Sequence, residues 1–180
     1  MSYLENDILK LRAPEPSDID LLYVWENDPE IWFCGNTIAP YSRFILSKYL
    51  ETAHLDIFEA KQLRLMINLK NKSNKSIGTI DLFDFDPYHN RAGIGILIAD
   101  KTERRKGYAS MSLELMIKYC FDFLGLNQLF CNIDTENKES LELFLSHGFE
   151  MVGIKKKWNK RGVDYFDECF LQLINKKNHQ

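Results

Sequence analysis

The chain has 180 residues, of which 45% are apolar and 27% charged, a balance typical of folded globular proteins. At this length we expect residues 1–180 to form a single domain. No apolar run approaches the ~20 residues of a membrane-spanning helix, and the polar start, MSYLENDILKLR, lacks the apolar core of a secretory signal. A net charge of −3 argues against a nucleic-acid-binding protein, because such proteins need a cationic face.

The charge is unevenly distributed. Residues 1–60 hold eleven acidic and four basic residues, a balance of −7, whereas residues 61–180 hold fifteen and nineteen, a balance of +4. Two interpretations stay open. The charges are spread by chance over solvated surfaces, or an acidic lobe lies beside a basic lobe and suits one cationic and one anionic partner.

The four cysteines, Cys34, Cys120, Cys131 and Cys169, are spaced 86, 11 and 38 residues apart. These gaps match neither a zinc site nor a CxxC redox pair. We therefore expect reduced, mostly buried thiols, no metal site and a cytoplasmic protein.

The first half of the chain predicts two helices and then three strands. Residues 8–12 alternate apolar and polar side chains like a strand, and Ser17 with Asp20 forms a capping box for a helix over 18–26. Residues 30–40 are expected to be irregular, and a second helix runs from Ser42 to about Ala53. Strands over 63–70, 76–86 and 92–99 follow, joined by short polar turns, which predicts an antiparallel meander.

In the second half of the chain the spacing of apolar residues changes from that of strands to that of a helix. Apolar residues from Gly107 to Leu124 recur every three or four positions, which predicts one helix of about five turns that Gly125 ends. A strand over 128–133, a helix from Asn137 to Gly148, and strands over about 149–157 and 164–173 around a turn at 159–162 complete the domain. The strand, helix and strand of residues 92–133 predict a right-handed crossover between parallel strands, in an otherwise mainly antiparallel sheet.

A basic loop precedes the long helix. Arg104, Arg105 and Lys106 lie beside the unpaired N–H groups and positive dipole of a helix start, an arrangement that binds anions. Gly107 has no Cβ, so a phosphate can approach the backbone there. The alternative is an ordinary solvated loop. A P-loop is absent, and Gly93-Ile94-Gly95 is no dinucleotide fingerprint because its third glycine is missing.

This loop, Arg104-x-x-Gly107-x-Ala109, resembles the [QR]xxGx[GA] pyrophosphate loop of the GCN5-related N-acetyltransferases (GNAT). Other blocks are similar, in the same order, to the ribosomal-protein and spermidine acetyltransferase branch: residues 9–12, 17–18 and 25–30 (WENDPE), the fourth strand 91–98 (RAGIGILI), and Asn137-x-x-Ser140 with Phe144 and 148–149 (GF). The resemblance covers nearly the whole chain. It implies a GNAT-like α/β (α+β) fold, with a mixed, mainly antiparallel central sheet of six to seven strands flanked by about four helices.

The resemblance implies acetyl-coenzyme A (acetyl-CoA) as the donor. The residues that match the family's pyrophosphate loop are Arg104, Arg105, Lys106, Gly107, Tyr108, Ala109 and Ser110. The pantetheine arm would lie along Ile96, Leu97 and Ile98 of the fourth strand. Asn137 would contact the same arm, and a plain helix N-cap is its other possible role.

Acetyl transfer needs an amine that has lost its proton and a site that stabilises the thioester oxyanion. The family's usual acid, a tyrosine, falls on Phe144, and its usual base, a glutamate, falls on Gly93, so neither position can titrate. Asp81 and Ser140 are the candidate catalytic residues beside Phe144, whose other possible role is packed core. Weaker candidates are Asp84, on the opposite face of its strand from Asp81, and His89, in a turn typical of surface residues.

The sequence thus predicts direct transfer of acetyl from acetyl-CoA to an amine in a ternary complex, because no cysteine stands beside an evident base. Candidate acceptors are a polyamine, a small amine or a protein N-terminus, and the acidic first 60 residues favour a cation. Candidate acceptor-binding residues are Glu26, Glu30 and Trp32. The alternative is a weakly active or inactive acyl-CoA-binding sensor with the same fold. We expect no nucleic-acid or membrane partner, and a homo-oligomer is possible.

Overall fold

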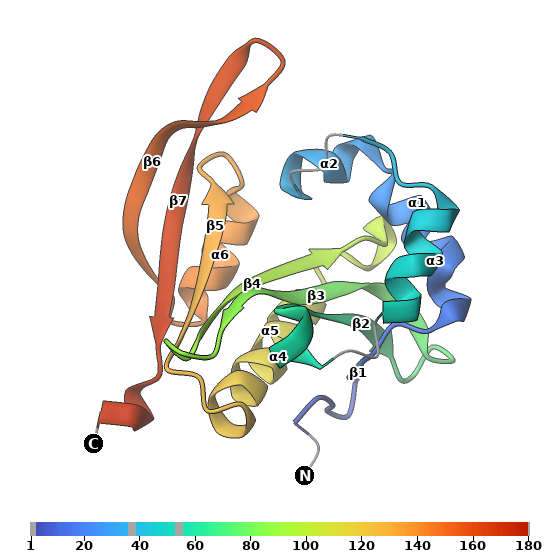
Figure 1. Cartoon of the computed structure of the whole chain (residues 1–180), viewed down its shortest axis with the longest axis horizontal. Helices are drawn as coiled ribbons and strands as arrows, with labels where there is room; N and C mark the ends of the chain where they lie inside the picture. Colours follow the sequence, from blue (N-terminus) through green and yellow to red (C-terminus); the bar gives the residue numbers. More distant parts are fainter. Residues whose placement is uncertain (1–2, 36–38, 53–55, 180) are drawn as a thin grey trace.

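The computed structural model describes residues 3–35, 39–52 and 56–179. Its centre is one seven-stranded sheet with the strand order β1-β2-β3-β4-β5-β7-β6 (Figure 1). The strands are β1 (Leu9–Arg12), β2 (Leu63–Leu69), β3 (Lys75–Asp86), β4 (Arg91–Ile98), β5 (Gln128–Asp134), β6 (Glu150–Arg161) and β7 (Asp164–Ile174). Every neighbouring pair is antiparallel except β4 and β5, which confirms the predicted meander, the parallel pairing of the strands on either side of the crossover, and the fold class.

Six α-helices accompany the sheet within the described ranges, where about four were expected: α1 (Ile19–Glu26), α2 (Pro29–Gly35), α3 (Arg43–Thr52), α4 (Ile57–Ala60), α5 (Tyr108–Lys118) and α6 (Lys138–Ser146). The expectation of irregular backbone over residues 30–40 is wrong for residues 30–35, because α2 occupies them, and residues 36–38 of that range lie outside the described residues. Pro29 suits the first position of a helix, and the Asp28 carboxylate accepts a hydrogen bond from Glu30 N at 3.0 Å. The Asn-Asp-Pro sequence therefore ends one helix and starts the next.

Three predicted boundaries also differ. The capping box before α1 is formed by Glu15 and Asp18 around a short 3₁₀ turn, instead of Ser17 and Asp20. The long helix becomes a π-helical turn over Tyr119–Phe123, where Leu124 N donates to Tyr119 O. Strand β6 continues to Arg161, so the hairpin turns at residues 162–163, later than expected.

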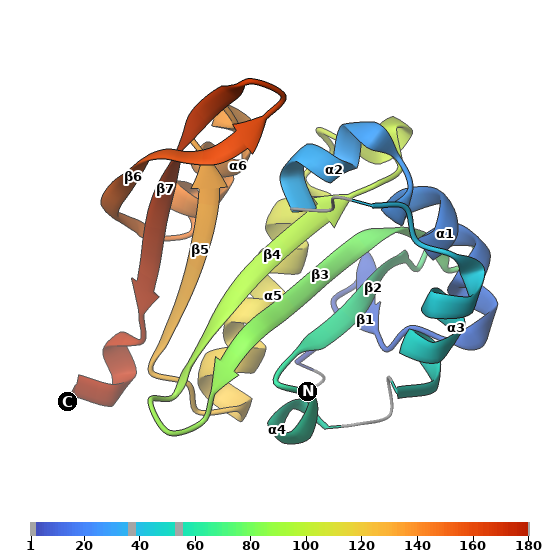
Figure 2. The same ribbon diagram turned by 45° about the horizontal axis from the view of Figure 1, so that its top comes forward.

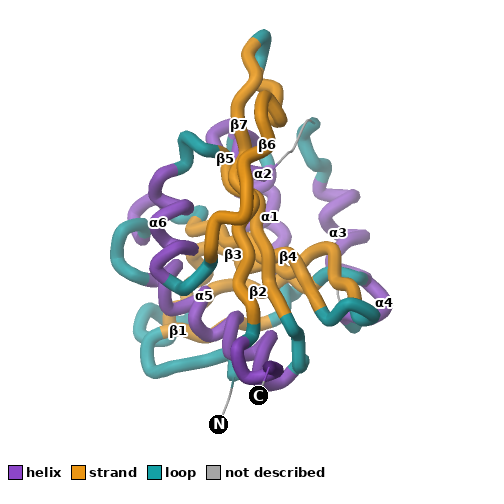
Figure 3. Tube along the Cα trace, turned by 90° about the vertical axis from the view of Figure 1, so that its left-hand side faces the viewer, coloured by secondary structure: helices purple, strands orange, loops and turns teal. Residues whose placement is uncertain are grey.

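Helices cover both faces of the sheet. Figure 3 shows α5 and α6 on one side of the strands and α1 and α3 on the other. The larger core lies under α5 and α6 and includes the buried residues Ile94, Leu113 and Leu129. A smaller core, including Leu22, Trp25 and Met66, lies under α1 and α3. Burial of these apolar side chains is the main force that holds the two helical layers on the sheet.

The predicted buried thiols are confirmed for Cys120, Cys131 and Cys169, which are all free cysteines. Burial raises the pKa of Cys131 to about 12 and also raises that of Cys120. The side chain of Cys34 lies outside the described residues. Within the described ranges, none of the helices has the length and apolar character that crossing a membrane requires.

Candidate active site

Strands β4 and β5 form a fork. Among the described residues, their pairing covers Arg91–Gly93 and Gln128–Phe130, and the two strands then diverge (Figures 1 and 2). On its other edge β4 stays paired with β3 as far as Ile98. Beyond Gly93 the edge of β4 that faces β5 therefore keeps backbone hydrogen-bonding groups that the sheet does not use. The predicted pantetheine residues Ile96, Leu97 and Ile98 lie on this part of β4.

The predicted anion loop connects β4 to the start of α5. Arg105 and Gly107 have positive φ angles of 59° and 82°, and Lys106 between them does not. Alternation of this kind turns successive N–H groups into a concave anion-binding nest, and the first turn of α5 adds its own free N–H groups. A Cβ on Gly107 would meet only the Met111 Cε atom, at 3.8 Å. The φ of Gly107 therefore favours glycine here, whereas the space around its Cα would admit a Cβ.

The basic side chains of the loop are each held by the protein. Arg104 Nε donates to the carbonyl oxygen of Ile98 at 2.8 Å, which ties the loop back to the end of β4. Lys106 Nζ lies 2.9 Å from Glu103 Oε2. Arg105 forms an ion pair with Glu139 in the first turn of α6. The loop is thus fixed to β4 and is connected across the fork to α6.

Glu103 anchors this loop, and the sequence reasoning missed it. Its carboxylate is only 4% exposed and binds Lys72 at 2.7 Å, Lys75 at 3.3 Å and Lys106 at 2.9 Å. Hydrogen bonds from Lys72 and then Lys106 lower the pKa of Glu103 to about 2. A single acidic residue directly before three basic ones was the available signal. Glu103 joins the β2–β3 hairpin to the loop and keeps Lys106 in place.

The first turn of α6 contains two further candidates. Asn137 Oδ1 accepts a hydrogen bond from Ser140 N at 3.1 Å, so Asn137 is the N-cap of this helix. Ser140 is half-buried in the same turn. Both residues lie on the side of the sheet that carries α5 and α6.

Phe144 lies in the core below this turn. Its side chain is 2% exposed and packs edge-to-face on Phe149, with 5.0 Å between the ring centroids. The structure therefore gives Phe144 a packing role and does not place it on an exposed wall of the fork.

Asp81 belongs to an ion cluster on the opposite face of the sheet. Arg64 of β2 donates from Nε to Asp81 Oδ1 at 2.6 Å and also pairs with Glu26 of α1. Burial disfavours the charge on Arg64, but Asp81 and then Glu26 outweigh this effect and raise its pKa. The cluster of Glu26, Arg64 and Asp81 has a net charge of −1. Asp81 is separated by the sheet from Ser140 and Phe144, so the structure does not bring the three catalytic candidates together.

The acceptor candidates lie on this same face. Trp32 Nε1 donates to the carbonyl oxygen of Glu26 at 2.7 Å and thereby fixes α2 on α1. Glu30 pairs with Lys101 at 2.7 Å, apart from the Glu26 cluster. Each of the two carboxylates thus already has a cationic partner, and a cationic acceptor would have to share or displace it.

An aromatic row crosses the open face of the sheet beside the fork. The ring centroids of Phe83 and Phe130 are 5.9 Å apart, and those of Phe130 and Phe170 are 5.7 Å apart. The Phe83 ring occupies the space above Gly93, where an added Cβ would lie 2.6 Å from Phe83 Cδ2. An aromatic ring from β3 therefore fills the space beside Gly93, the position on which the resemblance places the family's glutamate. Sequence reasoning missed this row because its members come from three separate strands.

A pocket of about 540 Å³ continues from this row toward the closed end of the fork. Phe130 and Phe170 line it together with Asp84, Asp86 and Arg91. Asp84 is exposed and has a φ of 49° at a bulge in β3, and bulges of this kind redirect side chains. Asp86 is paired with Arg91 at 3.1 Å. Asp84 and Asp86 are therefore the acidic residues of the pocket beside the aromatic row.

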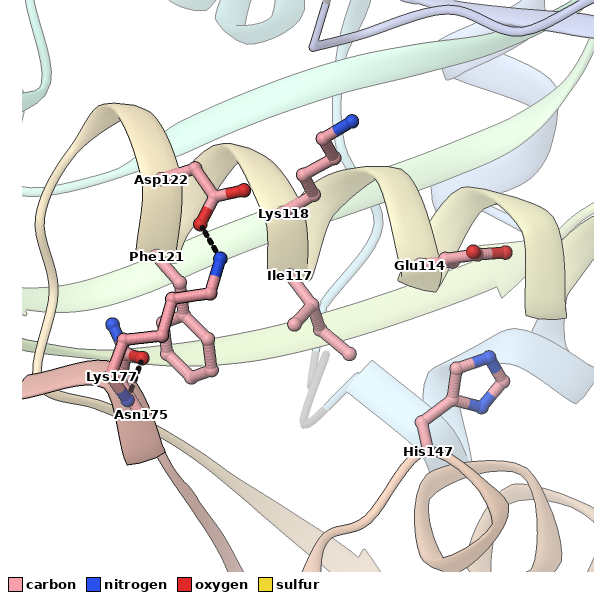
Figure 4. A pocket seen from close by; sticks show the side chains of 8 residues that line it. All are labelled: Glu114, Ile117, Lys118, Phe121, Asp122, His147, Asn175 and Lys177. Atoms are coloured by element: carbon pink, nitrogen blue, oxygen red, sulfur yellow. Dashed lines mark hydrogen bonds and ion pairs between the residues drawn. The ribbon is translucent and has the colours of Figure 1, made fainter.

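A second pocket, of about 340 Å³, runs along α5 toward the C-terminal end of the chain (Figure 4). Its polar groups include Lys177, which pairs with Asp122 at 2.8 Å, and Asn175, whose amide donates to Leu126 O. His147, at one end, lies 3.1 Å from the hydroxyl oxygen of Ser110. None of the predicted site residues lines this pocket. Across the described residues, no group of three or more His, Cys, Asp or Glu side chains could hold a metal ion.

The comparisons with known proteins agree with this geometry. Residues 9–150 match the family model described as the acetyltransferase (GNAT) domain. The uncharacterized N-acetyltransferase YoaA of Bacillus subtilis is 30% identical over 172 residues, covering 95% of this chain and 96% of that protein. Spermidine N(1)-acetyltransferase of Escherichia coli K12 is 25% identical over 148 residues, covering 81% and 74%.

The fold is shared with solved structures as well. The crystal structure of Vibrio cholerae spermidine N-acetyltransferase in complex with CoA and spermine superposes with a TM-score of 0.86 at 22% identity, covering 97% of this chain and 100% of that one. The family model and the Bacillus subtilis relative both span most of the sequence. The chain therefore belongs to the GNAT family of N-acetyltransferases.

Proposed function

We propose that the protein transfers an acetyl group from acetyl-CoA to a cationic amine, by direct attack in a ternary complex. The observation that carries this proposal is the position of the anion nest at Arg105–Gly107 beside the open fork of β4 and β5. The nest would bind a diphosphate, and the fork would bind an extended arm with amide groups. In acetyl-CoA a diphosphate is followed directly by such an arm.

Each part of the donor finds a matching part of the chain. The N–H groups of the nest and of Tyr108 to Ser110 in the first turn of α5 would hold the diphosphate. The edge of β4 at Ile96–Ile98 that β5 leaves unpaired would bind the pantetheine amides, with Arg104 already on the carbonyl oxygen of Ile98, and a backbone N–H of this edge would stabilise the thioester oxyanion. Asn137 caps α6 at the opposite wall, where its amide group would meet the same arm.

The reaction forms a bond from the amine nitrogen to the acetyl carbon and breaks the bond from that carbon to sulfur. The amine proton must leave before attack, and Asp81 is the candidate base because it is the register partner of Gly95 of β4 and lies on the face of the sheet that carries the acceptor candidates. Its carboxylate is held by Arg64, so it would have to accept the proton within that ion pair. The thiolate would leave without help from position 144, where Phe144 is buried. A thiol with an ordinary pKa near 8.5 is a fairly good leaving group, so this loss is tolerable.

Three features support a polyamine as the acceptor over a small amine or a protein N-terminus. The Glu26–Arg64–Asp81 cluster and Asp84 place acidic side chains near the aromatic row, before and after Phe83 along β3. Aromatic rings suit methylene chains and also attract ammonium groups through their faces. Two of the relatives bear the name spermidine acetyltransferase. Cytoplasmic location and homo-oligomerisation stay predictions.

The test is thiol release from acetyl-CoA with a panel of spermidine, spermine, short diamines, amino acids and peptides with free N-termini. We expect turnover that is fastest with the polyamines. Binding of acetyl-CoA without turnover on any amine would instead identify the sensor, which the absence of titratable groups at Gly93 and Phe144 favours. Failure to bind acetyl-CoA would refute both functions.

A further inference from the structure

The ion pair of Arg105 and Glu139 joins the two walls of the fork. Arg105 is part of the anion nest before α5, which packs on β4, β3 and β1. Glu139 lies two residues after the cap of α6, on the arm of the sheet formed by β5 and β7 (Figures 1 and 3). The pair therefore lies where the diphosphate of the donor would enter under the proposed function.

Stability does not account for this pair. The side chain of Arg105 is 83% exposed and that of Glu139 is 70% exposed, and such solvated ion pairs contribute little to folding. The position of the pair has a larger consequence for an anionic ligand. A diphosphate in the nest would attract the guanidinium of Arg105, which binds phosphate oxygens through two parallel hydrogen bonds. The carboxylate of Glu139 would repel the same diphosphate and holds Arg105 in its absence.

We propose that Glu139 is an intramolecular competitor of the donor's diphosphate and lowers the affinity of the protein for acetyl-CoA. In the free protein its carboxylate takes the place of a phosphate on Arg105. On binding, Arg105 exchanges the carboxylate for the diphosphate, and Glu139 is left as a nearby negative charge. The competition favours release of free CoA after each turnover, because CoA carries the same diphosphate. This inference rests on the proposed function.

The experiment measures the Kd of acetyl-CoA by isothermal titration calorimetry for the wild type, Glu139→Gln and Glu142→Gln. Glu142 is the matched control, because it is exposed on the same helix and forms no ion pair or hydrogen bond within the described part of the chain. Both substitutions remove one negative charge, but only Glu139→Gln frees Arg105. Pantetheine, which lacks phosphates, is the second ligand. Melting curves check that each variant is folded.

We expect Glu139→Gln to bind acetyl-CoA roughly threefold to tenfold more tightly at low salt, the size of a unit charge acting on a dianion through several ångströms of water. The gain should fade at high salt, be absent for pantetheine and for Glu142→Gln, and shrink when Arg105→Gln is added. Unchanged or weaker binding by Glu139→Gln would overturn the proposal, and so would an equal gain in Glu142→Gln. If the wild type and every variant fail to bind acetyl-CoA, the proposed function fails with it; binding without the gain refutes only the competition.

Discussion

Substitutions of Gly107 can distinguish the effect of this residue on the stability of the fold from its effect on the binding of acetyl-CoA. Gly107→Ala and Gly107→Asn both add a Cβ at a position where the nearest protein atom, Met111 Cε, is 3.8 Å away, so neither should clash within the protein. They differ in backbone preference at a φ of 82°. An alanine in the left-handed region costs roughly 1–2 kcal/mol, whereas asparagine tolerates that region better. We expect Gly107→Ala to melt about 2–8 °C lower and Gly107→Asn to melt closer to the wild type.

The affinity of the two variants for acetyl-CoA should not follow their melting temperatures. If the diphosphate approaches the backbone at Gly107, either Cβ pushes it away, and both variants lose hydrogen bonds to a charged group worth about 1.5–3 kcal/mol. This corresponds to roughly a tenfold to hundredfold rise in the Kd of acetyl-CoA, even in the stable Gly107→Asn variant. Chemical denaturation measures the free energy of unfolding, and calorimetry measures the Kd. Normal affinity in Gly107→Asn would refute close approach of the ligand to this residue.

Three further predictions concern the buried groups. Phe144→Tyr should lower the free energy of unfolding by about 1–3 kcal/mol without raising kcat, since the new hydroxyl has no partner in the core; a faster enzyme with an unchanged melting temperature would contradict this. Gly93→Glu should unfold at a lower temperature because of the Phe83 ring, and adding Phe83→Ala should recover much of the loss; no recovery would mean that another group opposes the side chain. The lowered pKa of Glu103 stabilises the fold above its ordinary value near 4.5, and this contribution is lost as the pH falls toward about 2. Glu103→Gln should therefore flatten the acid limb of the stability curve, and an acid limb of unchanged slope would refute the role of Glu103.

Local patterns were enough to predict most elements of the fold. The alternation in β2, β3 and β4 and the three-to-four spacing in α5 each lie within one segment, so periodicity reveals them. The anion loop was equally local, because Arg104 to Gly107 are consecutive. Helix α2 escaped prediction because Asn27-Asp28-Pro29 suits both the end and the start of a helix. The π-helical turn after α5 keeps an apolar face, so its different period was not visible.

The side-chain relationships of the site could not be read in the same way. Arg64 binds Glu26 and Asp81, which are 38 and 17 residues away in the sequence. The register of β2 and β3 brings Asp81 beside Arg64, and the packing of α1 on the sheet brings Glu26. The glycine at position 93 was explained only by Phe83, which lies across the β3–β4 ladder. Spacing along the chain carries no information on such contacts, because they depend on how separate strands are aligned.

The divergence of β4 from β5 also affects how the protein behaves toward other chains. A strand edge with free backbone groups at the rim of a sheet invites pairing with a neighbouring molecule and leads to aggregation. Here the free edge of β4 faces another arm of the same sheet, inside the notch of a V, so a foreign strand would have to enter between β4 and β5 to reach it. A slender chain with a few amide groups meets a lesser steric barrier. The divergence of β4 and β5 removes several hydrogen bonds from the sheet. The edge that is left unpaired can bind a slender ligand but is shielded from pairing with a second protein molecule.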